Sequence, residues 1–294
     1  MNNEYVFPES ELIINADGSI FHLHVKPAQL ADKVILVGDP GRVNLVASHF
    51  DSKECEVSNR EFHTITGTYK GKRITCLSTG IGCDNIDIVM NELDALANID
   101  FSTRKEKTTH RTLSLVRVGT CGGLQPNTPT GTFIASVKSI GFDGLLNFYA
   151  GRDEASDMEL EAAFKQHVGW TEKMGNPYVA TACPELIDRI AKNDMVRGIT
   201  IACGGFFGPQ GRRLRLPLMD PKLNEKIESF DYNGLSEDEL MLTFKPDYRN
   251  RIRKAPKKGV EVKICGKEAL DDFVRIMHET GERDGFSTRP KEYF

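Results

Sequence analysis

Three arginines stand beside glycine or turn residues, a combination that suits the binding of an anion. They occur in Gly38-Asp39-Pro40-Gly41-Arg42, in Ser58-Asn59-Arg60-Glu61-Phe62 and in Arg117-Val118-Gly119-Thr120. Turn backbones present N–H groups to an anion, and guanidinium groups bind phosphate oxygens through charge-assisted hydrogen bonds. Any one of these arginines alone is read more simply as a solvated or ion-paired surface residue. Together with the Thr120 hydroxyl they favour one phosphate site.

Short β-branched runs, each followed by a glycine or turn residue, predict strands. The runs are residues 34–37, 74–77, 115–118, 132–137 and 199–203. A helix is predicted between two of them, because one helical face collects Ile86, Val89, Met90, Leu93 and Ala97. We also expect a polar loop over 102–112 and a helical excursion over 151–176. This alternation predicts an α/β sheet with helical cover, in which ligands bind at strand ends.

The chain has seven cysteines, at positions 55, 76, 83, 121, 183, 203 and 265. They form no CxxC pair, and several of them stand in strand-like runs. They are interpreted as reduced core thiols. Cys121 lies in a glycine-rich turn, where a nucleophile is an alternative. The burial habits of free cysteine favour packing over that role.

The order of motifs resembles the nucleoside phosphorylase family, uridine phosphorylases in particular, over residues 18–235. The motifs are GDPxR at 38–42, SNREF at 58–62, STGIG at 78–82, RxGTCG at 117–122 and FFGPQGR at 206–212. The resemblance implies an α/β fold with a central mixed sheet flanked by helices. It implies that phosphate is bound by Gly38, Arg42, Arg117 and Thr120. It also implies that Arg60 reaches a neighbouring subunit's phosphate, and that His22 of Phe21-His22-Leu23 reaches that subunit's ribose.

The same resemblance implies a base site made of Phe206, Gln210 and Arg212. An aromatic face stacks on a base, while an amide and a guanidinium bond the oxygens and N3 of a pyrimidine. Negative charge grows on the departing base, so Arg212 would bind the transition state more tightly than the ground state, with Gln210 beside it. The plainer alternative is an aromatic and an arginine on an ordinary loop.

The family's reaction is attack of inorganic phosphate on C1′, which gives ribose 1-phosphate and free base without a cofactor or catalytic metal. Some members hold a monovalent cation between subunits, at positions that match Glu61, Ile81 and Asn85 here. Asn85 replaces the usual hydroxyl residue, so the resemblance does not decide whether this chain binds the ion. The family also implies a homodimer or a higher homo-oligomer.

The pattern breaks near residue 235, where the family has a Glu-Met-Glu segment that holds the ribose hydroxyls. Residues 230–235 still resemble the approach to it. The following Ser236-Glu237-Asp238-Glu239 is typical of a helix start with a capping box, not of the missing segment. We therefore expect residues 1–235 to form a phosphorylase-like domain that is incomplete at its C-terminus.

Residues 236–294 resemble an internal fragment of the Fem family of peptidoglycan-bridge aminoacyltransferases, at 244–253, 257–260 and 279–286. This predicts a second, small α/β tail fragment, with a helix over 268–278. The fragment ends before most substrate surfaces of that family. Seven Lys or Arg residues between 245 and 258 could attract RNA, but a solvated basic face is the better interpretation because only Tyr248 offers a stacking platform.

The overall composition points to no macromolecular partner. The chain has 294 residues, 39% hydrophobic residues and a net charge of −4, which gives no bias toward nucleic acid or anionic membranes. Its start lacks a basic segment followed by an apolar core, and no apolar run approaches the roughly 20 residues that span a bilayer. We expect a cytoplasmic protein.

The leading hypothesis is phosphorolysis of uridine in pyrimidine salvage, with activity impaired by the missing ribose segment. Loss of substrate positioning costs on the order of a hundredfold or more in rate. One alternative is a non-catalytic protein that binds phosphate or nucleobase. Another is an aminoacyltransferase fragment that needs a second chain.

Overall fold

The computed structural model describes residues 5–125, 128–192, 195–230, 274–275 and 279. The chain divides into two compact units, 1–234 and 235–294. Several predictions on the second unit therefore lie outside the described residues: the helix start at 236–239, the basic stretch at 245–258, Cys265 and most of the 268–278 helix. Within the described residues, no helix is long and apolar enough to cross a membrane.

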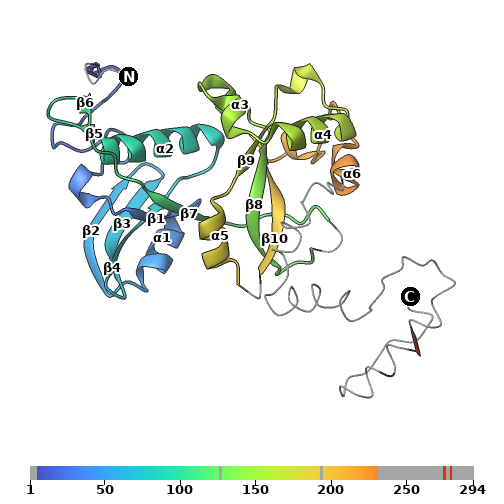
Figure 1. Ribbon diagram of the computed structural model, residues 1–294, viewed down its shortest axis with the longest axis horizontal. Helices are drawn as coiled ribbons and strands as arrows, with labels where there is room; N and C mark the ends of the chain where they lie inside the picture. The colour runs from blue at the N-terminus through green and yellow to red at the C-terminus, as the bar shows by residue number, and fades with distance from the viewer. Residues whose placement is uncertain (1–4, 126–127, 193–194, 231–273, 276–278, 280–294) are drawn as a thin grey trace, which may run out of the picture. The chain divides into compact units, whose positions relative to one another are not determined.

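The first sheet has five strands in the order β2-β3-β4-β1-β7 (Figure 1). They are β1 (Lys33–Val37), β2 (Ser52–Asn59), β3 (Phe62–Tyr69), β4 (Lys72–Ser78) and β7 (Ser114–Val118). β1 pairs parallel with β4 and β7, while β2, β3 and β4 pair antiparallel. The parallel pairing brings the carboxyl ends of β1, β4 and β7 to one edge of the sheet, where three of the glycine motifs begin.

Helices cover both faces of this sheet. Neighbouring residues of β1 point to opposite faces, so each packs against a different helix. Val37 packs with Val43 of α1 (Pro40–Ala47), in one core cluster. Leu36 belongs to another cluster, with Val89 and Leu93 of α2 (Cys83–Asn98). The sheet thus forms the middle layer between α1 and α2.

The buried stripe of α2 differs in one respect from the predicted face. Val89, Leu93, Leu96 and Ala97 are buried, but Met90 is 41% exposed. The stripe is centred on Val89, Leu93 and Leu96, so Met90 stands at its margin.

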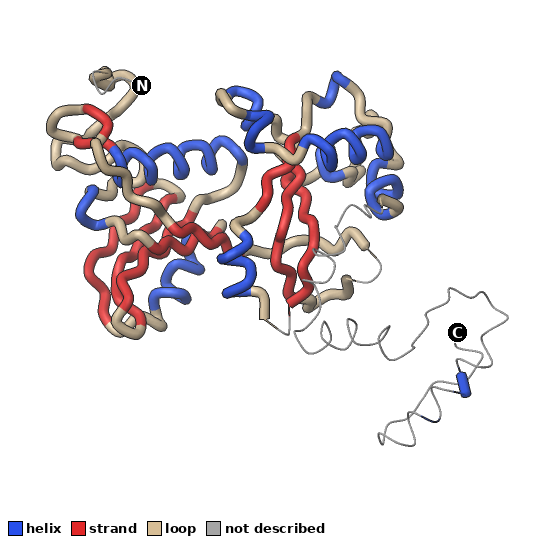
Figure 2. Tube along the Cα trace, viewed as in Figure 1, coloured by secondary structure: helices blue, strands red, loops and turns tan. Residues whose placement is uncertain are grey.

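The second sheet has three strands in the order β10-β8-β9, drawn beside the first sheet in Figure 2. They are β8 (Phe133–Gly141), β9 (Tyr178–Thr181) and β10 (Met195–Ala202). β10 runs parallel to β8, and β9 runs antiparallel to it. Helix α4 (Met158–Val168) and helix α6 (Leu223–Glu228) pack on this sheet through Leu160, Phe164 and Leu223.

Short elements complete the described chain. α3 (Arg152–Ala155), α4 and η3 (Glu172–Met174) form the predicted helical excursion, and α5 (Pro184–Ile190) precedes β10. The predicted polar loop contains β6 (Lys105–Glu106), which pairs with β5 (Ile99–Asp100). Three further 3-10 turns are η1 (Pro27–Gln29), η2 (Leu145–Phe148) and η4 (Gly208–Gln210). The α/β class with mixed sheets flanked by helices is confirmed, although the strands are divided among three sheets of five, three and two strands.

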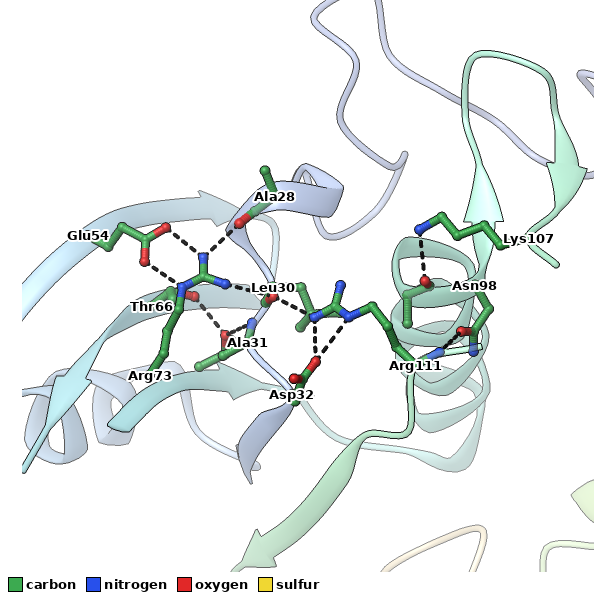
Figure 3. Close-up of polar contacts among 12 residues, drawn as sticks. Ala28, Leu30, Ala31, Asp32, Glu54, Thr66, Arg73, Asn98, Lys107 and Arg111 are labelled. Atoms are coloured by element: carbon green, nitrogen blue, oxygen red, sulfur yellow. Dashed lines mark hydrogen bonds and ion pairs between the residues drawn. The ribbon is translucent and has the colours of Figure 1, made fainter. Parts of the chain in front are cut away.

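Two arginines clamp the segment that leads into β1 (Figure 3). Arg73 donates to the carbonyls of Ala28 and Leu30 and forms two hydrogen bonds of 2.6 Å with Glu54. Arg111 donates to the same Leu30 carbonyl and to Asp32. Because these bonds satisfy the carbonyl groups of an irregular segment, they fix the entry into β1 and so the position of the turn that follows it.

Candidate active site

A cavity of about 620 Å³ lies at the carboxyl ends of β1, β4 and β7. Four of the five predicted phosphate residues line it: Gly38, Arg42, Arg117 and Thr120. The other lining residues are Asp39, Pro40, Glu61, Gly80, Ile81, Asn85 and Gly119. Residues that are far apart in the sequence are therefore brought together at a strand end, where α/β sheets hold their ligands.

Arg117 reaches the cavity from the end of β7, and its position depends on the glycines around it. Leu36 of β1 stands opposite Arg117 in the parallel register, so the turns after both strands are adjacent. A Cβ atom on Gly119 would lie 2.6 Å from Arg117 Nη1, and one on Gly38 would lie 3.8 Å from Nη2. The guanidinium therefore lies over two residues that lack side chains.

Arg42 stands in the first turn of α1, which begins directly after β1. The Asp39 carboxylate caps this helix by accepting a hydrogen bond of 2.9 Å from the Gly41 N–H. Pro40 at the first helical position has no N–H to satisfy. The helix thus starts at the cavity, where its dipole favours an anion beside the guanidinium of Arg42.

The side of the cavity near β3 and α2 is formed by Glu61, Ile81 and Asn85, the residues matched to a possible cation. They crowd around Gly80, whose φ is +69° and whose added Cβ would lie 2.7 Å from both Glu61 and Asn85. The Asn85 amide donates a hydrogen bond of 3.1 Å to the Ile81 carbonyl. Among the described residues no group of three His, Cys, Asp or Glu side chains could hold a metal ion.

The three predicted base residues lie together on the turn after β10. The Arg212 guanidinium lies over the Phe206 ring, 4.4 Å from its centroid, and Arg212 Nε donates to Gln210 Oε1 at 3.2 Å. The turn itself is held by the Arg212 N–H, which donates to the Phe207 carbonyl at 2.8 Å. Phe206 is 59% exposed, so the edge and surroundings of its ring are accessible to a flat ligand.

The base residues meet the phosphate loop at Gly122, which follows Thr120 closely in the chain. A Cβ atom on Gly122 would lie 3.7 Å from Arg212 Nη2. The cationic end of Arg212, in the turn after β10, therefore reaches the turn after β7. Phe206, Gln210 and Arg212 do not themselves line the phosphate cavity. The approach of Arg212 to Gly122 is what links the base residues to the phosphate loop.

Arg60 and His22 lie outside the residues that line the cavity. Arg60 is exposed at the turn between β2 and β3, in the left-handed backbone region with a φ of +53°. Such a conformation is uncommon for a residue with a side chain. The neighbouring Asn59 donates a hydrogen bond of 2.8 Å to the His22 carbonyl. The segment that carries Arg60 is thus bonded, through Asn59, to the segment that carries His22.

The predicted packing of Cys121 and Cys183 is wrong, because both are exposed, Cys121 in the turn after β7. The expectation of core thiols holds for Cys76, which is buried, and burial raises the pKa of its thiol to about 12. Burial also raises the pKa of Cys203 to about 11, with the Asp143 carboxylate adding to the effect. These two thiols are protonated at neutral pH and are poor nucleophiles.

Two groups near the site were missed by the sequence reasoning. Asp39 was counted only as part of a turn, although an aspartate before a proline and a helical pattern is a recognisable helix cap. Glu92 binds His22 across 70 positions of the sequence. No local pattern could have indicated that contact.

The fold and the cavity define an α/β protein that gathers two guanidinium groups and a hydroxyl at the ends of parallel strands, with Arg212 of an aromatic turn close to Gly122. The family model described as the phosphorylase superfamily matches residues 32–234, and the chain belongs to that family. The FemAB family model matches residues 224–294, which agrees with the resemblance of the tail.

The relatives include an enzyme named for uridine, a pyrimidine nucleoside, and an enzyme named for purine nucleosides. The chain is 28% identical over 191 residues to a uridine phosphorylase of Thermococcus kodakarensis, covering 61% of this chain and 64% of the relative. It is 32% identical over 167 residues to a DeoD-type purine nucleoside phosphorylase of Geobacillus kaustophilus, covering 54% and 65% respectively. The chain thus spans just under two thirds of the length of these two relatives.

A solved structure agrees with the fold. A Trypanosoma brucei nucleoside phosphorylase, described as showing uridine phosphorylase activity, superposes with a TM-score of 0.67 at 30% identity. The match covers 76% of this chain and 79% of that protein.

Proposed function

We propose that this protein catalyses the phosphorolysis of a nucleoside, with uridine as its favoured substrate, and that inorganic phosphate is the co-substrate. The observation that carries the proposal is the convergence of Arg42, Arg117 and Thr120 on one cavity that adjoins Arg212. Two guanidinium groups and a helix start suit a phosphate dianion. Membership of the phosphorylase superfamily supports the reaction class.

In the proposed reaction, a phosphate oxygen forms a bond to C1′ of the sugar as the bond from C1′ to the base nitrogen breaks. The electron pair of the broken bond leaves with the base, which takes up a proton, and ribose 1-phosphate remains. The phosphate must therefore be held on the opposite side of C1′ from the base. Arg42 and Arg117 would orient the attacking oxygen toward C1′, and such positioning raises the reaction rate.

Arg212 would stabilise the negative charge that grows on the departing base. Its hydrogen bond with Gln210 places an amide beside the guanidinium, and this pair suits the adjacent oxygen and N3 positions of a pyrimidine. Among the relatives, the Thermococcus kodakarensis and Trypanosoma brucei proteins support uridine, while the Geobacillus kaustophilus protein makes purine nucleosides the necessary comparison. No cofactor is part of this proposal.

The experiment is the phosphate-dependent release of uracil from uridine and of hypoxanthine from inosine by the full-length protein. We expect uracil release that requires phosphate and is lost in Arg212→Ala. The matched control is Arg213→Ala, because Arg213 is an exposed neighbour outside the proposed site. Preferential release of hypoxanthine would contradict the uridine assignment, and no release of either base by folded protein would contradict phosphorolysis.

A second candidate function is the binding of nucleobase and phosphate without turnover. It is favoured by the sequence after Leu235, where Ser236-Glu237-Asp238-Glu239 stands in place of the Glu-Met-Glu segment. The described part of the site contains the phosphate and base residues, so both ligands could bind without a grip on the ribose. Calorimetric binding of uracil and phosphate by a protein that does not cleave uridine would support this candidate.

A further inference from the structure

One carboxylate holds His22 by three separate groups. Glu92 Oε1 lies 2.6 Å from His22 Nδ1 and 2.9 Å from the His22 backbone N. Its other oxygen, Oε2, accepts a hydrogen bond of 2.8 Å from the Leu23 N–H. Glu92 comes from α2, and its side chain is 12% exposed. The contact joins the N-terminal segment to a helix of the core.

This arrangement determines which ring nitrogen of His22 carries the proton. Backbone N–H groups can only donate, so both oxygens of Glu92 already act as acceptors. The carboxylate therefore presents acceptor oxygens to the imidazole ring rather than a donor. The short contact with Nδ1 is then a hydrogen bond donated by Nδ1–H, and in a neutral imidazole Nε2 carries no proton and is an acceptor.

The ring is held on its other sides as well. Phe21 packs edge-on against it with centroids 4.7 Å apart, and Phe62 does so at 6.5 Å. Asn59 fixes the His22 carbonyl. The His22 side chain is nevertheless 27% exposed, and within the described residues Nε2 has no hydrogen-bond partner. A fixed ring with one outward acceptor is suited to recognising a hydroxyl group.

We propose that Glu92 is a positioning residue that fixes His22 in its Nδ1–H tautomer, so that Nε2 accepts a hydrogen bond from a sugar hydroxyl of a nucleoside bound to a second copy of this chain. The inference rests on the proposed function for the identity of the ligand. A second copy is invoked because neither His22 nor Arg60 lines the cavity of its own chain. Asn59, which precedes Arg60, donates to the His22 carbonyl and so bonds the two segments.

The tautomer is tested directly by ¹⁵N spectroscopy of the histidine side chains in the full-length protein. Spectra are recorded at about pH 9, where histidines are neutral, and His22→Gln identifies the signal. We expect the unbound protein to show an unprotonated Nε2 and a protonated Nδ1. A signal from protonated Nε2 in the unaltered protein would overturn the proposal, and this measurement depends on no enzymatic activity.

The Glu92→Gln variant tests the link between the carboxylate and the hydroxyl. An amide can donate to Nδ1, so the variant is expected to shift the tautomer toward Nε2–H and to raise the KM for uridine about tenfold, with a smaller effect on kcat. Asp94→Asn is the matched control, because Asp94 is an exposed carboxylate on the same helix that bonds only Asn98 among the described residues. An unchanged tautomer and KM in folded Glu92→Gln would contradict the proposal.

The hydroxyl is identified with uridine analogues that lack the 2′, 3′ or 5′ hydroxyl group. The analogue that lacks the bonded hydroxyl should lose affinity in the unaltered protein and lose little more in His22→Gln. If all three analogues respond equally to His22→Gln, no hydroxyl binds Nε2 and the proposal fails. If the protein binds but does not cleave uridine, dissociation constants replace KM, so failure of the proposed reaction is distinguished from failure of this inference.

Discussion

At the residue scale, the phosphate part of the site depends on where a side chain is absent. Arg117 Nη1 lies 2.6 Å from the position that a Cβ on Gly119 would occupy. Any larger residue at 119 must displace the guanidinium, because a contact of that length is too short for two heavy atoms. The glycine is therefore part of the binding arrangement rather than a feature of the turn alone.

We expect Gly119→Ala to raise the KM for phosphate about tenfold, which corresponds to the loss of roughly one charge-assisted hydrogen bond. The free energy of unfolding should change by less than about 1 kcal/mol, because the displaced group is the end of a flexible side chain. Steady-state kinetics with varied phosphate and denaturant unfolding measure the two effects. Gly198→Ala is the control, since its Cβ would meet Ile134 at an ordinary 3.8 Å. Equal phosphate KM values for both variants would contradict the argument.

The guanidinium of Arg212 is expected to matter for its shape as well as its charge. Arg212→Lys keeps a positive charge but loses the planar group that lies over Phe206 and bonds Gln210. We expect kcat/KM for uridine to fall about a hundredfold, within the range seen when one donor to a transition state is removed. Arg213→Lys should have no such effect. Full activity in Arg212→Lys would show that charge alone is sufficient.

At the element scale, Asp157 connects three parts of the second sheet and its cover. Its carboxylate caps α4 by accepting from the Leu160 N–H at 3.0 Å, and it forms an ion pair of 2.8 Å with Lys138 of β8. Its own N–H donates to the Val179 carbonyl of β9. Burial on its own would raise the pKa of Asp157, but the Leu160 N–H and the Lys138 ammonium outweigh it, and the pKa lies below the ordinary 3.8.

This lowered pKa gives a signed prediction for stability. Because the folded-state pKa is below the unfolded value, the contribution of Asp157 is fully present above about pH 4 and is lost as the pH falls through the folded pKa. Asp157→Asn should reduce the free energy of unfolding by about 1–3 kcal/mol at pH 7, through the weaker cap and the lost ion pair. Denaturant unfolding at pH 7 and near pH 2.5 tests this. A difference between the two proteins that is equal at both pH values would refute it.

At the scale of the whole molecule, neither His22 nor Arg60 lines the cavity that holds Arg42 and Arg117, and Asn59 beside Arg60 bonds the His22 carbonyl. If they complete the site of a second copy, each site is made by two chains. Arg42→Ala and Arg60→Ala should then be nearly inactive alone but active when co-expressed. Random pairing makes half of the dimers mixed, and each mixed dimer has one intact site of two, so we expect about a quarter of full activity.

Co-expression followed by phosphorolysis assays on the purified mixture measures this recovery. The control pairs Arg42→Ala with Arg117→Ala, since both residues line the cavity of one chain. A mixed dimer of these two variants has a defect in each site, so no recovery is expected. Activity of the Arg42 and Arg60 mixture that stays at the level of either variant would place Arg60 in its own chain's site.

The sequence by itself determined the local structure and the chemistry of the phosphorylase-like part. The β-branched runs became β1, β4, β7, β8 and β10, and glycine turns after them brought Gly38, Arg117 and Thr120 to one cavity. These features follow from short-range rules, because periodicity sets the strands and parallel pairing sets where they end. The aromatic, amide and guanidinium of the turn at 206–212 were also recognisable from residue types alone.

Only the tertiary structure decided what depends on contacts between distant segments. The bond between Glu92 and His22 spans 70 positions, and the exposure of Cys121 and Met90 depended on how the surrounding elements pack. The division of the larger strands between a five-stranded and a three-stranded sheet, which pack on α2 and α4 respectively, likewise could not be read from any single run. Burial and long-range pairing arise only where two segments of the chain meet. A single stretch of sequence specifies its own surface but not the surface that will cover it.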